Sequence, residues 1–117
     1  MNKVLAVWKP TNISSFDVIR KIKSYDKSLK IGHCGTLDPF AEGVLIICIG
    51  SFTKKVDYYM SQSKRYVASI TFGKETDTLD LTGRFIKSTN PLKKIKLTDI
   101  QLIMNNFIGT ISQIPPY

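Results

Sequence analysis

The pattern of hydrophobic and polar positions predicts several short strands along the chain. Residues 3–8 form a first apolar strand, and residues 44–49 form a continuous apolar run rich in β-branched side chains. Such a run is typical of a strand buried on both faces. Residues 65–72 alternate regularly between two sets of side chains, as a strand with one inner and one outer face does. Residues 84–87 and 110–114 predict two further short strands.

Apolar positions at helical spacing predict three helices. Residues 15–25 place apolar side chains on one stripe with basic side chains outside it, and Ser14 or Ser15 is positioned to cap this helix. Residues 51–61 form a second helical segment. Residues 98–101 have the capping-box pattern and begin a third helix, whose apolar stripe we expect in the core. The members of that stripe are Ile100, Ile103, Met104, Phe107 and Ile108.

This mixture of strands and helices, with a polar loop over residues 73–83, indicates the α+β (mixed α/β) class. A length of 117 residues favours one compact domain, and 43% hydrophobic residues suit a globular protein. The 17 Lys and Arg residues outnumber the 9 Asp and Glu residues, which gives a net charge of +8. Such a surface favours a polyanionic partner such as nucleic acid, and the alternative is a merely basic soluble protein.

The cysteine pattern excludes two classes of protein. Cys34 and Cys48 have thirteen residues between them, and the chain has a single histidine to accompany them. This is neither a zinc-binding spacing nor a disulfide framework, so we expect free thiols, no bound metal and a reducing, cytoplasmic location. No apolar run approaches the roughly 20 residues that a membrane helix needs, so no membrane association is expected.

The segment most informative about function is residues 32–43. It combines three glycines, a proline, the only histidine and Asp38, and it ends at the apolar run of residues 44–49. This composition predicts a tight loop held between buried elements. Catalytic groups concentrate on such loops, so Asp38 is a candidate catalytic residue. The alternative is that Asp38 caps the turn before Pro39, a frequent role for aspartate.

Other motifs surround this loop along nearly the whole chain. They are Lys9-Pro10 with Ser14-Ser15-Phe16-Asp17-Val18, Gly35-Thr36-Leu37-Asp38-Pro39 within the loop, Ile49-Gly50 with Thr53-Lys54, Lys64-Arg65-Tyr66, Thr76-Asp77-Thr78-Leu79-Asp80 with Gly83, and Phe107-x-Gly109 with Gln113-x-Pro115-Pro116-Tyr117. In this order they resemble the TruB family of tRNA pseudouridine synthases. The series is specific, although a single Gly-Thr-Leu-Asp sequence is not.

The resemblance implies a fold, a reaction and a partner. The implied fold is the mixed α/β pseudouridine-synthase catalytic domain, and the implied reaction converts a uridine in the T-loop of tRNA to pseudouridine. The partner is the T-arm stem-loop, and no cofactor is needed because the isomerisation involves no redox change. Residues 1–117 are expected to be the N-terminal portion of the catalytic domain, incomplete at the C-terminus. The family's later Arg-bearing strand, its pocket Leu and its C-terminal RNA-binding domain have no counterpart here.

The resemblance also assigns roles to individual residues. Asp38 is the carboxylate that acts at the sugar, by the same logic as glycosidase carboxylates. Tyr66 stacks on the target base and moves a proton, whereas a strand Tyr is otherwise usually a core aromatic. His33 stacks in the space that the flipped uridine leaves, the alternative being a satisfied loop histidine. Lys9 and Pro10 support the loop rather than take part in the chemistry.

The remaining candidate residues bind or position the substrate. Gly35, Thr36 and Leu37 shape the loop around Asp38. Asp77 and Asp80 contact the base or position their own loop, with a solvated turn as the alternative. A basic cluster of Lys93, Lys94 and Lys96 is either a solvated face or a phosphate contact.

The chain departs from the family pattern at three positions. Trp8 stands where the family usually has Asp, while Cys34 and Glu42 replace residues that are commonly Thr. A module that grips a tRNA arm without catalysis is the second hypothesis. A nucleotide-binding protein is disfavoured, because the loop glycines lack both the dinucleotide spacing and a phosphate-loop lysine. If the family sheet continues further, an unpaired strand edge is exposed and the isolated chain is expected to self-associate.

Overall fold

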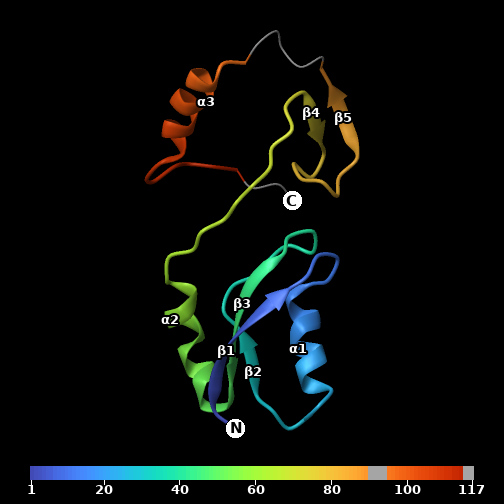
Figure 1. The fold of residues 1–117 in the computed structure, drawn as a ribbon, viewed down its shortest axis with the longest axis vertical. Coiled ribbons are helices and arrows are strands. Elements are labelled where there is room, and N and C mark those ends of the chain that lie inside the picture. The colour runs from blue at the N-terminus through green and yellow to red at the C-terminus, as the bar shows by residue number, and fades with distance from the viewer. Residues whose placement is uncertain (90–94, 115–117) are drawn as a thin grey trace. The chain divides into compact units, whose positions relative to one another are not determined.

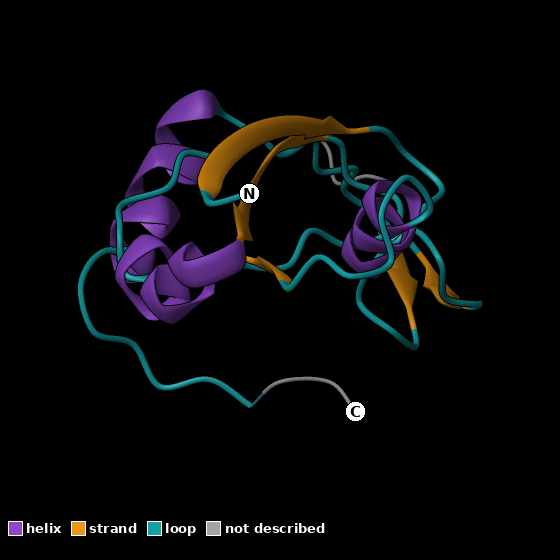
Figure 2. Ribbon diagram, turned by 90° about the horizontal axis from the view of Figure 1, so that it is seen from below, coloured by secondary structure: helices purple, strands orange, loops and turns teal. Residues whose placement is uncertain are grey.

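The computed structural model describes residues 1–89 and 95–114, and its contacts divide the chain into two compact units, Met1–Tyr66 and Val67–Tyr117 (Figure 1). Each unit holds an antiparallel sheet together with helix, so the predicted α+β class is confirmed. Much of the chain lies in loops and turns (Figure 2). Among the described residues, no helix combines the length and the apolar character that crossing a bilayer requires.

The first unit contains a sheet of strands β1 (Lys3–Lys9), β2 (Ile31–His33) and β3 (Gly43–Ile49) in the order β1-β3-β2. Both pairings are antiparallel, and β1 aligns with β3 over its whole length. The strands predicted at residues 3–8 and 44–49 are confirmed, and β2 was not predicted. The middle position of β3 explains its continuous apolar sequence, because it packs on both sides.

Helices cover both faces of this sheet (Figure 1). Helix α1 (Ser15–Lys23) covers one face, and the core there consists of Val18, Ile19, Leu45, Ile47 and Ile49. The 3-10 helix η1 (Gly50–Lys55) continues into α2 (Val56–Met60), so the helical segment predicted over residues 51–61 begins with tighter turns than expected. A Cβ added at Gly32 would lie 3.2 Å from Val56 Cγ2, which places α2 on the face opposite to α1.

Ser14, not Ser15, caps helix α1. Ser14 Oγ accepts a hydrogen bond from the Asp17 amide at 3.1 Å, and Asp17 Oδ2 accepts one from the Ser14 amide at 2.7 Å. This reciprocal pair is a capping box that satisfies two otherwise free amides at the helix start. The sequence left both serines open, and the choice of Ser14 leaves the Ser15 hydroxyl free for another partner.

The cap makes helix α1 sensitive to acid. Hydrogen bonds from Ser14 and then Arg20 lower the pKa of Asp17 to about 2. Because this pKa is depressed in the folded state, the contribution of the Asp17 carboxylate is complete above about pH 4 and is lost as the pH falls toward 2. We expect the difference in urea midpoint between the parent chain and Asp17→Asn to shrink over this range. A difference that stays constant from pH 5 to pH 2 would contradict the assignment.

The second unit holds a hairpin of β4 (Lys74–Thr76) and β5 (Phe85–Ser88), followed by α3 (Leu97–Met104) and the 3-10 helix η2 (Asn105–Phe107). The strand predicted at residues 84–87 is confirmed with a shift of one residue, whereas β4 lies inside the segment predicted to be loop. Two strand predictions, at residues 65–72 and 110–114, are wrong for this structure. A strand needs a ladder partner, and no described segment pairs with either of them.

Two predictions for the third helix are also wrong. Helix α3 begins at Leu97 with Lys96 at the N-cap and no side-chain cap, so Thr98 lies inside the first turn and forms no capping box. Its apolar stripe is not in a core, since Ile103 is 58% exposed and Phe107 is 69% exposed. No described residue of the second unit is buried. The helical pattern therefore predicted the position of the helix correctly, but the predicted burial of its apolar face was wrong.

Candidate active site

The loop between β2 and β3 carries Asp38 at its centre, and a buried serine holds the residue before it. Ser15 lies in the first turn of α1 and is 2% exposed. Its hydroxyl accepts a hydrogen bond from the Leu37 amide at 2.9 Å and also lies 3.2 Å from the Leu37 carbonyl oxygen, to which it donates. Ser15 therefore satisfies both backbone groups of Leu37 and fixes one side of Asp38.

A buried lysine holds the residue after Asp38. Lys9, the last residue of β1, is fully buried, and its ammonium group donates to the carbonyl oxygens of Pro10 at 3.0 Å, Ile13 at 2.8 Å and Pro39 at 3.4 Å. The backbone amide of Asn12 also donates to the Pro39 carbonyl oxygen, at 2.7 Å. The Lys9-Pro10 turn is thus tied directly to the loop, and Asp38 is clamped on both sides by elements of the core.

The Asp38 carboxylate has no bonding partner in the described part of the chain. The backbone carbonyl of Asp38 accepts a hydrogen bond from the Ala41 backbone amide at 3.0 Å, which closes the turn, while the Asp38 side chain is exposed. Among the described residues, no hydrogen bond or ion pair to this carboxylate occurs. A capping aspartate accepts backbone amides with its side chain. The turn-capping alternative is therefore not what this structure shows, and the carboxylate is presented to solvent on a fixed backbone.

His33 lies at the end of β2, opposite Ile47 of β3, and its ring is anchored to the loop. Its Nδ1 lies 2.7 Å from the Gly35 carbonyl oxygen, so Nδ1 carries the proton in this hydrogen bond. Gly35 has a φ of 104°, in the region that favours glycine. The ring is half-buried, and Thr36 next to Gly35 is exposed. The glycine thus allows the turn that brings its carbonyl to the histidine.

The Lys64-Arg65-Tyr66 motif approaches the same loop through its lysine. Lys64 Cε would lie 3.7 Å from a Cβ added at Gly35. Tyr66 is 66% exposed and lies outside regular structure, so it is not the core aromatic that its pattern otherwise favours. Sequence reasoning missed the contact of Lys64 and the clamping roles of Ser15 and Asn12. The only available signal was that all three belong to, or adjoin, the quoted motifs.

In the second unit, the Thr-Asp-Thr loop uses its carboxylates to hold itself together. Asp80 Oδ1 accepts hydrogen bonds at 2.7 Å from the Thr78 hydroxyl, the Thr82 amide and the Thr82 hydroxyl. The two threonines lower the pKa of Asp80 through these bonds. Asp77 Oδ1 accepts from the Arg84 amide at 2.8 Å. Both carboxylates therefore accept hydrogen bonds within their own loop, and a contact of Asp77 or Asp80 with the base stays a prediction.

This loop requires glycine at position 83, and that requirement is testable. A Cβ at Gly83 would lie only 2.9 Å from Thr76 Cβ and would also collide with the side chains of Asp77 and Thr78. We expect Gly83→Ala to displace the loop and remove the protection of the Thr82 and Arg84 amides in hydrogen–deuterium exchange. Ser88→Ala, at an exposed position of β5, is the matched control. Unchanged protection in Gly83→Ala would show that the loop accommodates the methyl group.

The two cysteines, separated in sequence, lie side by side. Cys34 and Cys48 are buried free thiols whose Sγ atoms are 3.3 Å apart. Burial, followed by the hydrogen bond to Cys48, raises the pKa of Cys34 to about 12. No group of three or more potential metal-ligating His, Cys, Asp or Glu side chains occurs in the described part of the chain.

The buried thiols are expected to be inert in the folded protein. The raised pKa of Cys34 leaves almost no thiolate at that residue, and burial keeps a reagent away from both sulfur atoms. We expect labelling by an aromatic disulfide reagent at pH 8 to be at least about 100-fold slower in the native chain than in denaturant. The variant Ser63→Cys places a thiol at an exposed position and is expected to react at once. Native labelling of Cys34 or Cys48 as fast as that control would contradict their packing.

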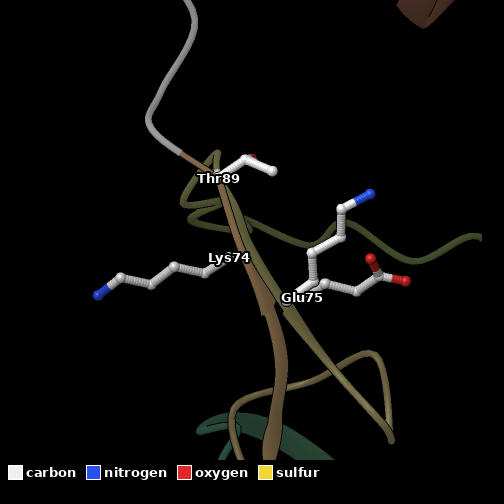
Figure 3. A pocket seen from close by; sticks show the side chains of 5 residues that line it. Lys74, Glu75 and Thr89 are labelled. Carbon is white, nitrogen blue, oxygen red and sulfur yellow. The ribbon is translucent and has the colours of Figure 1, made fainter.

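Of the three lysines predicted as a possible phosphate contact, the structure describes only Lys96. Lys93 and Lys94 lie outside the described residues, as does the Pro115-Pro116-Tyr117 end of the last motif. Lys96 is exposed at the start of α3. A hollow of about 200 Å³ on the hairpin is lined by Lys74, Glu75 and Thr89 among others. Figure 3 shows Lys74 and Glu75 pointing to opposite sides of the hairpin.

Comparison with known proteins places these features in a family. Residues 20–117 match the N-terminal domain of the TruB family of pseudouridylate synthases. Proteins named tRNA pseudouridine synthase B are similar to 99% of the chain, with 47% identity in Clostridium tetani, 42% in Listeria monocytogenes and 40% in Fusobacterium nucleatum. The chain covers 40%, 38% and 40% of these three proteins, or about two-fifths of their length.

Proposed function

Since the chain belongs to the TruB family of pseudouridylate synthases, we propose that it supplies the catalytic carboxylate of an enzyme that isomerises a uridine in the T-loop of tRNA. One observation carries this proposal. The Asp38 carboxylate is exposed and unpaired among the described residues, while the backbone on both sides of it is clamped by Ser15 and Lys9. A free group on a rigid support is the arrangement that nucleophilic catalysis requires.

The proposed chemistry needs no external reactant. Asp38 adds to the sugar or stabilises a positively charged sugar as the bond from C1′ to N1 of uracil breaks. The uracil departs as an anion with the bonding electron pair and turns, and a bond forms from C1′ to C5 as any bond from Asp38 to the sugar breaks. N1 takes up a proton, and the proton on C5 leaves as the pyrimidine ring regains its double bond. Tyr66 is proposed to stack on the base and to move this proton, and His33 to fill the space that the extruded base leaves. Electrons balance, because one glycosidic bond replaces another.

The domain assignment and the partner are part of the same proposal. Residues 1–117 are proposed to form the N-terminal portion of a pseudouridine-synthase catalytic domain, in keeping with coverage of about two-fifths of the relatives. The partner is the T-arm of tRNA, which the net charge of +8 attracts. The same limited coverage favours a second candidate function, in which the chain binds a T-arm without turnover. The cytoplasmic location inferred from the cysteines stays a prediction.

The test uses a T-arm stem-loop RNA whose target uridine carries tritium at C5. Isomerisation must eject this label, so tritium release measures turnover, and filter binding of the same RNA measures affinity. With the chain in excess over RNA, release supports a working site within residues 1–117. Binding without release supports the second candidate. Neither binding nor release by the chain, under conditions where the Clostridium tetani relative releases tritium, would overturn both candidates for the isolated chain.

A further inference from the structure

The side chain of Lys64 extends from the segment after α2 toward the loop that carries Asp38. Lys64 Cε lies 3.7 Å from the position that a Cβ would take at Gly35, which is three residues before Asp38. Burial raises the pKa of the Cys34 thiol, and the positive charge of Lys64 opposes that rise. The contact and the charge both place the Lys64 ammonium group beside the start of the loop.

The hydrogen bonds of Lys64 leave part of its bonding capacity unused. Its Nζ donates to the carbonyl oxygens of Met60 and Gln62, the latter at 2.9 Å. These two bonds hold the side chain at the end of α2, whereas an ammonium group has three N–H donors. Lys64 is exposed and forms no ion pair with any described carboxylate. A positioned ammonium group with a free donor and an unpaired charge therefore lies at the surface beside the loop.

Lys9 also contacts the loop but cannot take an external ligand. It is fully buried, and its Nζ donates to three carbonyl oxygens, one for each N–H. Residues 32–43 contain two carboxylates, Asp38 and Glu42, and neither lysine nor arginine. The loop therefore has no lysine or arginine of its own, and Lys64 is positioned to offset its negative charge when an anion approaches.

We propose that Lys64 binds a phosphate group that flanks the target uridine in a T-arm RNA. This inference rests on the proposed function, because it takes that RNA as the partner. An RNA that presents a sugar to Asp38 brings the phosphates on either side of the sugar close to a carboxylate that repels them. A fixed cation beside the loop offsets this repulsion and sets the register of the RNA backbone against Asp38. Lys64 is thus a substrate-binding residue and takes no part in the bond changes.

The first measurement is filter binding of a T-arm stem-loop RNA by the full chain between roughly 50 and 200 mM salt. Each phosphate that a protein neutralises contributes about 0.7–0.9 to the slope of log affinity against log salt concentration. We expect Lys64→Gln to lower this slope by about that amount and to weaken binding at least about threefold. Lys64→Arg keeps the charge and is expected to retain the slope of the parent chain.

The matched control is Lys3→Gln, at the end of the sheet away from the loop. Lys3 is exposed and pairs with Ile49, whereas Lys9 at the other end of β1 pairs with Gly43 beside the loop. A strand of this length spans about 20 Å, which is about twice the screening length in 0.1 M salt. Lys3→Gln is therefore expected to leave the salt slope within about 0.3 of the parent value.

A double-mutant cycle between protein and RNA identifies the phosphate. Two T-arm RNAs carry an uncharged methylphosphonate, one on the 5′ side and one on the 3′ side of the target uridine, and a third carries it in the stem as a control. One of the flanking changes is expected to weaken binding by the parent chain at least about threefold and to have no further effect on Lys64→Gln, because that contact is already lost. The stem change is expected to be additive with Lys64→Gln.

Additive losses at both flanking phosphates would overturn the proposal, as would an unchanged salt slope in Lys64→Gln. If Lys64→Gln fails to fold, Lys64→Arg decides, and a slope reduced in Lys64→Arg as well would overturn the proposal. A parent chain that binds no T-arm RNA would overturn it together with both candidate functions for the isolated chain. Coupling at a flanking phosphate without tritium release would support this inference and the second candidate function. Tritium release without such coupling would support the reaction and reject this inference.

Discussion

Asp38→Asn is expected to abolish tritium release from a T-arm stem-loop, with a loss of at least about 1000-fold in single-turnover rate. Asparagine has nearly the same shape but is a far weaker nucleophile and carries no charge to stabilise a positive sugar. The variant is compared with the parent chain under the conditions in which the parent chain releases tritium. Because the Asp38 side chain is exposed and bonds to no described residue, the free energy of unfolding is expected to stay within about 0.5 kcal/mol of the parent value.

Asp57→Asn is the matched control, since Asp57 is an exposed carboxylate on α2 and has no role in the proposal. It is expected to retain full release and full RNA binding. Binding of the T-arm by Asp38→Asn is expected to be unchanged or slightly tighter, because the substitution removes a negative charge near a polyanion. An Asp38→Asn variant with normal release would remove this residue from the chemistry and leave the loop without a catalytic group.

Lys9→Met is expected to lower the free energy of unfolding of the first unit by about 2–4 kcal/mol. Methionine keeps the aliphatic volume but removes the fully buried ammonium group, so three carbonyl oxygens lose their donor. Pro39 retains the bond from the Asn12 amide, so the loop is expected to loosen rather than to detach. Urea unfolding followed by circular dichroism measures the change.

The control for this substitution is Lys23→Met, at an exposed position in the last turn of α1. Its effect is expected to stay within about 0.5 kcal/mol, as is usual for surface positions. Under native conditions, Lys9→Met is also expected to speed amide exchange at Ala41, whose bond to the Asp38 carbonyl closes the turn. A stability loss equal to that of the control would mean that the ammonium group contributes little and that the turn holds the loop through its backbone alone.

Local pattern was sufficient for the elements that complete their interactions within a short stretch of chain. The periodicity of residues 15–25 located α1, and the unbroken apolar run located β3, because a central strand is apolar on both faces whatever its neighbours are. The motifs around Asp38 led to the family without any structural information. They did so because the backbone turns around the loop need particular residue types at fixed spacing.

Partners distant in sequence had to be located by the tertiary structure. The tertiary structure shows that Ser14 caps α1 and that Ser15 bonds to Leu37 of the loop, a division that the sequence left open. The register of β2 with β3 brings Cys34 beside Cys48. The alternation at residues 65–72 is a property of the sequence, but a strand exists only when another strand accepts its hydrogen bonds. In the same way, the sequence shows which face of α3 is apolar, whereas the burial of that face depends on whether another element packs against it.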